Sequence, residues 1–324
     1  MLSIINRRIL SMFFVVTMLL GFTLIGVGAD FPDRDINIII PFGSGGGTDQ
    51  ISRLIAAIIE EESSVNWVCN NLVGGAGAIG LQELTTKRPN GYTILLMTSN
   101  MSILEHMGHA NLTYKDFEPI IAVNYDEPAL FVHVDSGWES LNDFVDAAKG
   151  KRLKLQTGAA GGLWQVGAIS MSEELEIDLN IVPSATGGAP AAPALLGKQV
   201  DAICVPINEA LAGFDTGEFV MLATFGQERS YLAPEVPTFK ELGYEKLQIL
   251  SVRSFYAPKG TPREIINILH DKVKKAIDSE RYIEYVKNTG SNKIYLSTDE
   301  LIDYLEWEYE AYKELIEMAG LLKG

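Results

Sequence analysis

The 324-residue sequence contains little cysteine, little histidine and few positive charges. Its two cysteines and four scattered histidines show no spacing typical of a metal site. The 26 lysines and arginines are outnumbered by 42 aspartates and glutamates, which gives a formal net charge of -16. Such an acidic chain repels nucleic acid and anionic membrane surfaces. We therefore expect no metal, no cofactor and no nucleic-acid partner.

The N-terminus has the layout of an export signal. Arg7 and Arg8 precede an apolar run over residues 9–27, and Val27, Gly28 and Ala29 are small residues suited to signal peptidase. This pattern predicts a signal peptide over residues 1–29 and a periplasmic or extracytoplasmic location. The apolar run is long, so an uncleaved membrane anchor remains the alternative.

Glycine-rich turns occur at four places, each followed by a helix-compatible run. They are residues 41–48 (PFGSGGGT), 74–80 (GGAGAIG), 158–162 (GAAGG) and 187–190 (GGAP). Glycine permits close approach of the backbone to a ligand, and a helix N-terminus offers unpaired N–H donors. No catalytic constellation accompanies these turns. The pattern favours capture of a small anion between two lobes.

Apolar runs of strand length alternate with helical periodicity along the chain. Residues 37–41 (NIIIP) predict a buried strand, and residues 49–62 predict the helix that follows. A second series of strands and helices begins near residue 126, and helices over residues 264–279 and 298–318 end the chain. This alternation predicts an α/β fold with parallel strands.

Several ordered motifs resemble one known family. They are residues 31–49 (FPDRDINIIIPFGSGGGTD), 70–80 (NNLVGGAGAIG), 188–202 (GAPAAPALLGKQVDA), 228–244 (ERSYLAPEVPTFKELGY) and 256–269 (YAPKGTPREIINIL). From Phe31 onward the chain resembles the extracytoplasmic solute receptors of tripartite tricarboxylate transporters, also called Bug-type receptors.

This resemblance implies a two-lobed α/β fold of the periplasmic-binding-protein type II class, with the ligand in the cleft. The chain would cross twice between lobe 1, residues 30–125 with 250–324, and lobe 2, residues 126–249. Family ligands are mostly small carboxylates, and the receptor delivers them to a membrane permease with a large and a small subunit. It also implies a monomer that is not an enzyme.

The ligand-binding residues that we expect come from the four glycine turns and from the end of one strand. This chain departs from the family at Ser44, where proline is commoner, and at Gln165, where histidine is common. The fourth turn is one residue longer and places Thr186 where a polar contact is expected. The complete set is Phe42, Gly43, Ser44, Gly45, Gly46, Gly75, Ala76, Gly77, Ser99, Asn100, Gly161, Gly162, Trp164, Gln165, Thr186, Gly187 and Gly188.

Two other functions compete with capture of an anion. Residues 75–80 fit G-x-G-x-x-G, a short and common pattern that would suit a dinucleotide. Ser44 and Ser99 are the plausible nucleophiles of an exported serine-type hydrolase of α/β fold, although no histidine is obviously placed as their base.

Five side chains carry further expectations. Cys69 and Cys204 fall in predicted strands of different lobes, so we expect two buried free thiols; a disulfide would instead join the lobes. We expect His106 and His109 to lie at the surface. Trp164 either lines the pocket or packs beneath its helix.

Overall fold

Two β-sheets organise the computed structural model, which describes residues 31–184 and 187–323. The first sheet has six strands in the order β11-β4-β10-β3-β1-β2. Strand β1 pairs in parallel with β2 and β3, whereas β10 runs antiparallel to β3 and β4. Its strands are β1 (Ile36–Ile40), β2 (Trp67–Asn71), β3 (Thr93–Met97), β4 (Phe117–Asp126), β10 (Ser251–Pro258) and β11 (Asn292–Leu296).

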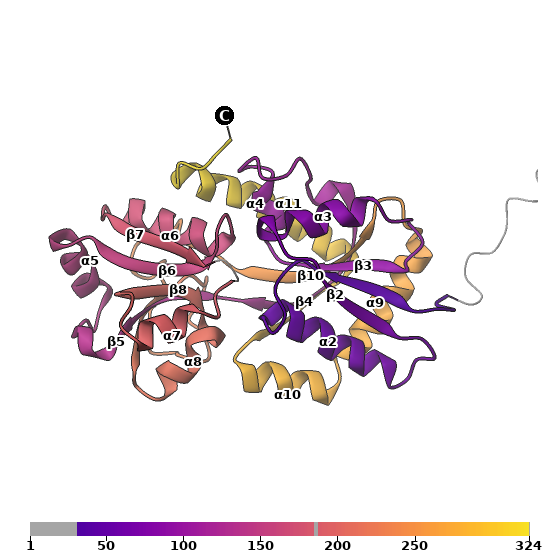
Figure 1. Cartoon of the computed structure of the whole chain (residues 1–324), viewed down its shortest axis with the longest axis horizontal. Helices are drawn as coiled ribbons and strands as arrows, with labels where there is room; N and C mark the ends of the chain where they lie inside the picture. Colours follow the sequence, from indigo (N-terminus) through magenta and orange to yellow (C-terminus); the bar gives the residue numbers. More distant parts are fainter. Residues whose placement is uncertain (1–30, 185–186, 324) are drawn as a thin grey trace, which may run out of the picture. The chain divides into compact units, whose positions relative to one another are not determined.

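The second sheet has five strands in the order β7-β6-β8-β5-β9. Strand β6 is parallel to β7 and β8, and β5 is antiparallel to β8 and β9. Its strands are β5 (Pro128–His133), β6 (Leu153–Ala159), β7 (Leu179–Ser184), β8 (Ala202–Pro206) and β9 (Phe219–Thr224). The chain leaves the first sheet between β4 and β5 and returns to it at β10, so the two sheets form two lobes joined by two crossovers (Figure 1).

Helices cover both faces of the first sheet within residues 34–324 (Figure 1). Helices α2 and α9 pack together on one face, and α3, α4 and α11 cover the other. The apolar positions of α2 recur at helical spacing, so that Ile51, Ile55 and Ile59 are buried against the sheet. The helices are α2 (Gly47–Glu60), α3 (Ala78–Thr85), α4 (Met101–Leu104), α9 (Arg263–Ile277), α10 (Glu280–Thr289) and α11 (Thr298–Met318).

The second sheet is covered in the same way. Helices α5 and α6 share one hydrophobic core, and α7 and α8 share another with β5, β8 and β9. The Ser140 hydroxyl caps α5 and Asp143 returns the bond to the Ser140 backbone, so the two residues form a capping box. These helices are α5 (Leu141–Gly150), α6 (Leu163–Glu174), α7 (Ala191–Leu196) and α8 (Ile207–Asp215).

The last helix contacts both lobes. In its first half Leu301 and Leu305 pack into the core of the first sheet. In its second half Leu315 and Ile316 join the core formed with α5 and α6. The bounds predicted for this helix are those observed.

The α/β class predicted from the sequence is confirmed, but the prediction of parallel strands is only partly right. Both sheets are mixed, and the sequence reading missed β4 entirely. It also missed the helices α8 and α10, and it missed α4. Strand β4 is buried along almost its whole length, so it lacks the polar alternation that marks a half-exposed strand.

Both cysteines are free thiols in different sheets. Cys204 is buried, as expected, whereas Cys69 is only half-buried. Burial raises the pKa of Cys69 to about 11 and that of Cys204 to about 12, so both thiols are protonated at neutral pH.

No helix in the part of the chain that the structure describes has the length and apolar character needed to span a bilayer. No group of three or more metal-binding side chains is found there either. The predicted signal peptide, residues 1–29, lies outside the described residues.

Candidate functional site

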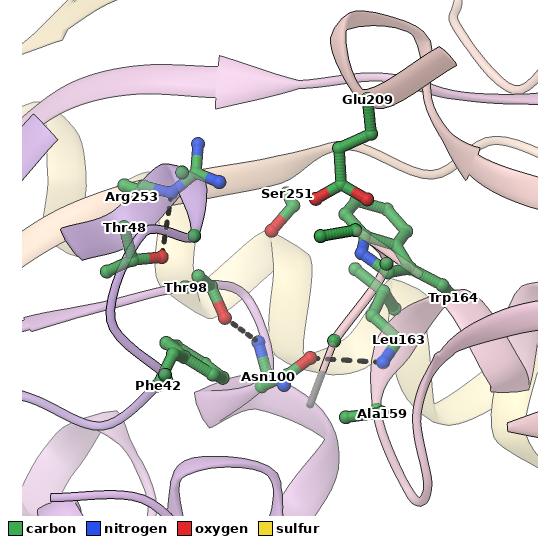
Figure 2. Close-up of a pocket in the computed structure, with 17 residues that line it drawn as sticks. Phe42, Thr48, Thr98, Asn100, Ala159, Leu163, Trp164, Glu209, Ser251 and Arg253 are labelled. Carbon is green, nitrogen blue, oxygen red and sulfur yellow. Dashed lines mark hydrogen bonds between the residues drawn. The ribbon is translucent and has the colours of Figure 1, made fainter. Parts of the chain in front are cut away.

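A pocket of about 90 Å³ is lined by residues from both sheets and their loops. Its walls come from the start of α2, the ends of β3 and β6, the start of α6, the turn before α7, and from α8 and β10. Figure 2 shows polar side chains from these elements converging on the same space. The volume admits a few water molecules or one small molecule.

The first wall is the N-terminus of α2. The residue that precedes the helix is Gly46, and no side chain caps the first turn. The first N–H groups of a helix have no partner inside the helix and lie at the positive end of its dipole. Gly47 and Thr48 both line the pocket, so this end of α2 presents backbone donors to a ligand.

Arg253 of β10 lies beside this helix end. Its Nε donates to the Thr48 hydroxyl at 3.0 Å, as Figure 2 shows, and its Nη2 pairs with the Asp126 carboxylate. The Ser291 hydroxyl donates to the same carboxylate at 3.0 Å. Both members of the ion pair are buried, and a Cβ on Gly47 would come within 2.8 Å of Nη2. Glycine at position 47 therefore leaves room for the guanidinium.

Asn100 connects the two lobes across the pocket. Its side-chain oxygen accepts from the Leu163 amide at the start of α6 at 3.0 Å, and its side-chain nitrogen donates to the Ala76 carbonyl at 3.0 Å. Its own amide donates to the Thr98 hydroxyl at 3.3 Å. Asn100 is buried, so each of these bonds replaces one that water would otherwise supply.

The second wall belongs to lobe 2 and carries Trp164, the turn at Gly187 and Gly188, and Glu209. Gly158 makes room for the indole, because a Cβ there would lie 2.6 Å from Trp164 Cδ1. Figure 2 shows the Glu209 carboxyl directed into the pocket on the side of Trp164. Burial, together with the nearby Asp126 charge, raises the pKa of Glu209 to about 7, and Arg253 opposes that rise.

Eight of the residues selected from the sequence line this pocket. Trp164 is among them, and it also packs against the core around α5 and α6, so it has features of both roles considered for it. The eight are Phe42, Gly43, Gly46, Asn100, Gly162, Trp164, Gly187 and Gly188.

Another eight lie outside the lining, and several of their polar groups are occupied within the protein. The Gly45 amide donates to Asp49 at 2.9 Å and the Gly161 amide to the side-chain oxygen of Gln165 at 2.7 Å. The Ser99 hydroxyl donates to Glu308. Thr186 lies outside the described residues. The eight are Ser44, Gly45, Gly75, Ala76, Gly77, Ser99, Gly161 and Gln165.

The sequence reading missed nine lining residues, of which Arg253 and Glu209 carry charge. Arg253 is the one basic residue in an apolar strand (SVRSFYAP), and such an isolated charge was the available signal. Glu209 follows the apolar strand β8 at the start of a helix that the reading did not identify. The remaining seven are Gly47, Thr48, Thr98, Ala159, Leu163, Ala189 and Ser251.

The two serines considered as nucleophiles have other partners. Ser44 donates to Asp49 at 3.4 Å, and Ser99 is tied to Glu308. His106 is buried, which makes the expectation of a surface position wrong; one ring nitrogen lies 3.0 Å from the Tyr309 carbonyl oxygen. His109 is exposed as expected. Among the described residues no histidine lies within hydrogen-bond distance of either serine, so the geometry does not support a hydrolase.

A sequence model described as the tripartite tricarboxylate transporter family receptor, TctC, matches residues 51–321. A UPF0065 protein from the gbd 5′ region of Cupriavidus necator is 28% identical, covering 91% of this chain and 90% of that protein. Protein BugT of Bordetella pertussis is 26% identical, covering 91% of this chain and 92% of its own length.

Solved structures give the same picture. A TctC solute-binding protein from Polaromonas, without ligand, is 30% identical with a TM-score of 0.72, covering 89% of this chain and 99% of its own. The periplasmic binding protein BugD is 25% identical with a TM-score of 0.82, and the match covers 91% of this chain and 100% of BugD. MatC from Rhodopseudomonas palustris, with bound malate, shares the fold at 23% identity and a TM-score of 0.78. The match covers 88% of this chain and 100% of MatC. These relatives are binding proteins, not enzymes.

Proposed function

Because the chain belongs to the tripartite tricarboxylate transporter receptor family and is a solute-binding receptor, we propose a ligand for its pocket. In this proposal the chain holds one small organic carboxylate between its lobes. The observation that carries this proposal is the uncapped N-terminus of α2 beside the Arg253 guanidinium. A binding protein of the same fold holds malate, a dicarboxylate.

In the proposed complex, one carboxylate of the ligand accepts from the amides of Gly47 and Thr48. The hydroxyls of Thr98 and Ser251, which also line the pocket, supply further donors. Each charge-assisted bond contributes roughly 1.5–3 kcal/mol. After the costs of ordering are subtracted, a few such bonds support an affinity in the micromolar range, about -8 kcal/mol.

The proposal also covers the protein's location, its oligomeric state, its closure and its permease partner. The receptor acts outside the cytoplasm as a monomer, closes around its ligand at the two crossovers, and delivers it to a membrane permease with a large and a small subunit. We assign residues 30–125 and 250–324 to one closing lobe and residues 126–249 to the other. The Asn100 bond to Leu163 would help to hold the closed state, because it spans the two lobes.

Calorimetric titration with a panel of mono-, di- and tricarboxylates and amino acids tests this function. We expect saturable binding of at least one compound with a stoichiometry of one and without its consumption. A matching rise in melting temperature would show that the ligand binds the folded state. Consumption of a compound, or failure of the whole panel to bind, would contradict the proposed function.

A further inference from the structure

Glu209 places a carboxyl group at the pocket with one oxygen unpaired among the described residues. It lies in the first turn of α8, and the pocket is lined by its side chain. Its Oε2 atom is shielded from solvent and has no hydrogen-bond partner among the described residues. Buried carboxylate oxygens are rarely left unpaired in folded proteins, because the lost hydration costs free energy. An unpaired oxygen at a ligand pocket points to a donor on the ligand.

The turn at Gly187 and Gly188 leaves the space in which the Glu209 carboxyl lies. A Cβ on Gly188 would come within 1.8 Å of Glu209 Oε2, so only glycine at position 188 allows the carboxyl to lie there. The turn at Gly187 and Gly188 is one of the four that the sequence suggested for an anion. In the structure, the carboxyl group of Glu209 packs against Gly188 of this turn.

The charges around Glu209 leave its own charge uncompensated. The two charged groups that act on it are Asp126 from β4 and Arg253 from β10. These two form a buried pair with each other and so cancel. An ionised Glu209 therefore makes this side of the pocket negative, whereas the end of α2 is positive.

We propose that Glu209 is a specificity-determining residue that accepts hydrogen bonds from the ammonium group of an amino carboxylate, whose carboxylate lies at the N-terminus of α2. This inference rests on the proposed function, which supplies the carboxylate end of the ligand. An ammonium group offers three donors and a positive charge, and it satisfies both the unpaired oxygen and the uncompensated charge. A ligand hydroxyl satisfies the oxygen alone.

A second ligand carboxylate at this position gives the opposite linkage to pH. Two carboxylates cannot both be ionised at hydrogen-bond distance, so a dicarboxylate would bind to protonated Glu209 and take up a proton. An ammonium group binds to ionised Glu209 and releases a proton, because it lowers the pKa of a group that burial has raised to about 7. The sign of the proton exchange at neutral pH thus separates the two arrangements.

The test compares L-aspartate with succinate and L-glutamate with glutarate, since each pair differs by one ammonium group. Calorimetry at neutral pH in buffers of different ionisation enthalpy gives both the affinity and the proton exchange. The variants are Glu209→Gln and Gly188→Ala, which removes the charge or displaces the carboxyl. Asp215→Asn is the matched control, because it removes an exposed charge from the same helix.

We expect the amino member of at least one pair to bind at least about tenfold more tightly, with release of protons. This preference should disappear in Glu209→Gln and in Gly188→Ala, and persist in Asp215→Asn. Tighter binding of the dicarboxylates with proton uptake would overturn the inference and leave the proposed function standing. An equal preference in Glu209→Gln would also overturn it. If none of the four compounds binds, this inference fails, and the wider panel decides whether the proposed function fails with it.

Discussion

The two walls of the pocket differ in what they offer a ligand. The wall from the first sheet presents the uncapped start of α2, the hydroxyl of Thr48 and the guanidinium of Arg253. The wall from lobe 2 presents the indole of Trp164 and the carboxyl of Glu209. The first side therefore offers hydrogen-bond donors, whereas the second adds an acceptor, the Glu209 carboxyl, beside the indole N–H of Trp164. A site with this polarity orients an asymmetric ligand, whereas two donor walls would favour a symmetric dianion.

The two lobes also treat their buried acids differently. Glu308 of α11 lies in the lobe of the first sheet and accepts from Ser102 at 2.6 Å, from Tyr304 at 3.0 Å and from Ser99. Burial raises the pKa of Glu308 to about 7, although these three bonds oppose the rise. Glu209 has no such bonds to Oε2. The protein itself satisfies Glu308, whereas no group in residues 31–184 or 187–323 pairs with Oε2 of Glu209.

The largest effect should come from Arg253→Met. It leaves Asp126 buried with only Ser291 as a partner, which costs about 3–5 kcal/mol of unfolding free energy. Urea denaturation measures the loss, and titration with the identified ligand should show no binding to the folded fraction. Arg263→Met is the control, because Arg263 pairs with Asp299 at the surface and its loss should change stability little. Equal stability of the two variants would contradict the role given to the Arg253–Asp126 pair.

Glu308→Gln tests the buried acid of the first lobe. The folded-state pKa of Glu308, about 7, lies above its ordinary value of 4.5. Its contribution to stability is therefore fully present below about pH 4.5 and is lost as the pH rises through about 7. The stability of the wild type relative to Glu308→Gln should fall by about 3 kcal/mol between about pH 4 and about pH 8. Denaturation across this range measures the difference, and a constant difference would contradict the account.

Gly47→Val should weaken binding at the first wall by about 10–100-fold. A Cβ at this position meets the Arg253 guanidinium, and the added side chain also covers the helix end that donates to the ligand. Calorimetric titration measures the affinity. Gly150→Val is the control in lobe 2, because no atom lies within 4 Å of a Cβ there. Unchanged affinity in Gly47→Val would remove the start of α2 from the site.

Asn100→Ala should have the smallest effect, because it removes a bond between the walls and no contact that the proposed ligand requires. It leaves the Leu163 amide without its side-chain partner, which costs about 1–2 kcal/mol in the closed state, whereas the bond to Ala76 lies within lobe 1 and is lost in both states. We expect affinity to fall about 5- to 30-fold, mainly through faster dissociation. Stopped-flow kinetics measures the two rates, and an unchanged dissociation rate would argue against a closing role.

The sequence predicted the α/β class, most strands and the first glycine turn, because buried β-branched runs and helical periodicity are local signals. It could not predict that the amides of Gly45 and Gly161 donate hydrogen bonds to Asp49 and Gln165, since those bonds depend on how the turns fold. Nor could it bring Arg253 to Thr48 across 205 positions of sequence. Glycine marks where backbone can approach a ligand, but side chains that arrive from distant strands decide which amides remain free.

The measurement that tests this account most directly is a crystal structure with the identified ligand bound. It should show a ligand carboxylate within hydrogen-bond distance of the Gly47 and Thr48 amides, and an ammonium group on the Glu209 carboxyl. A ligand outside this pocket, or a ligand carboxylate placed against Glu209 with no contact to the start of α2, would contradict it.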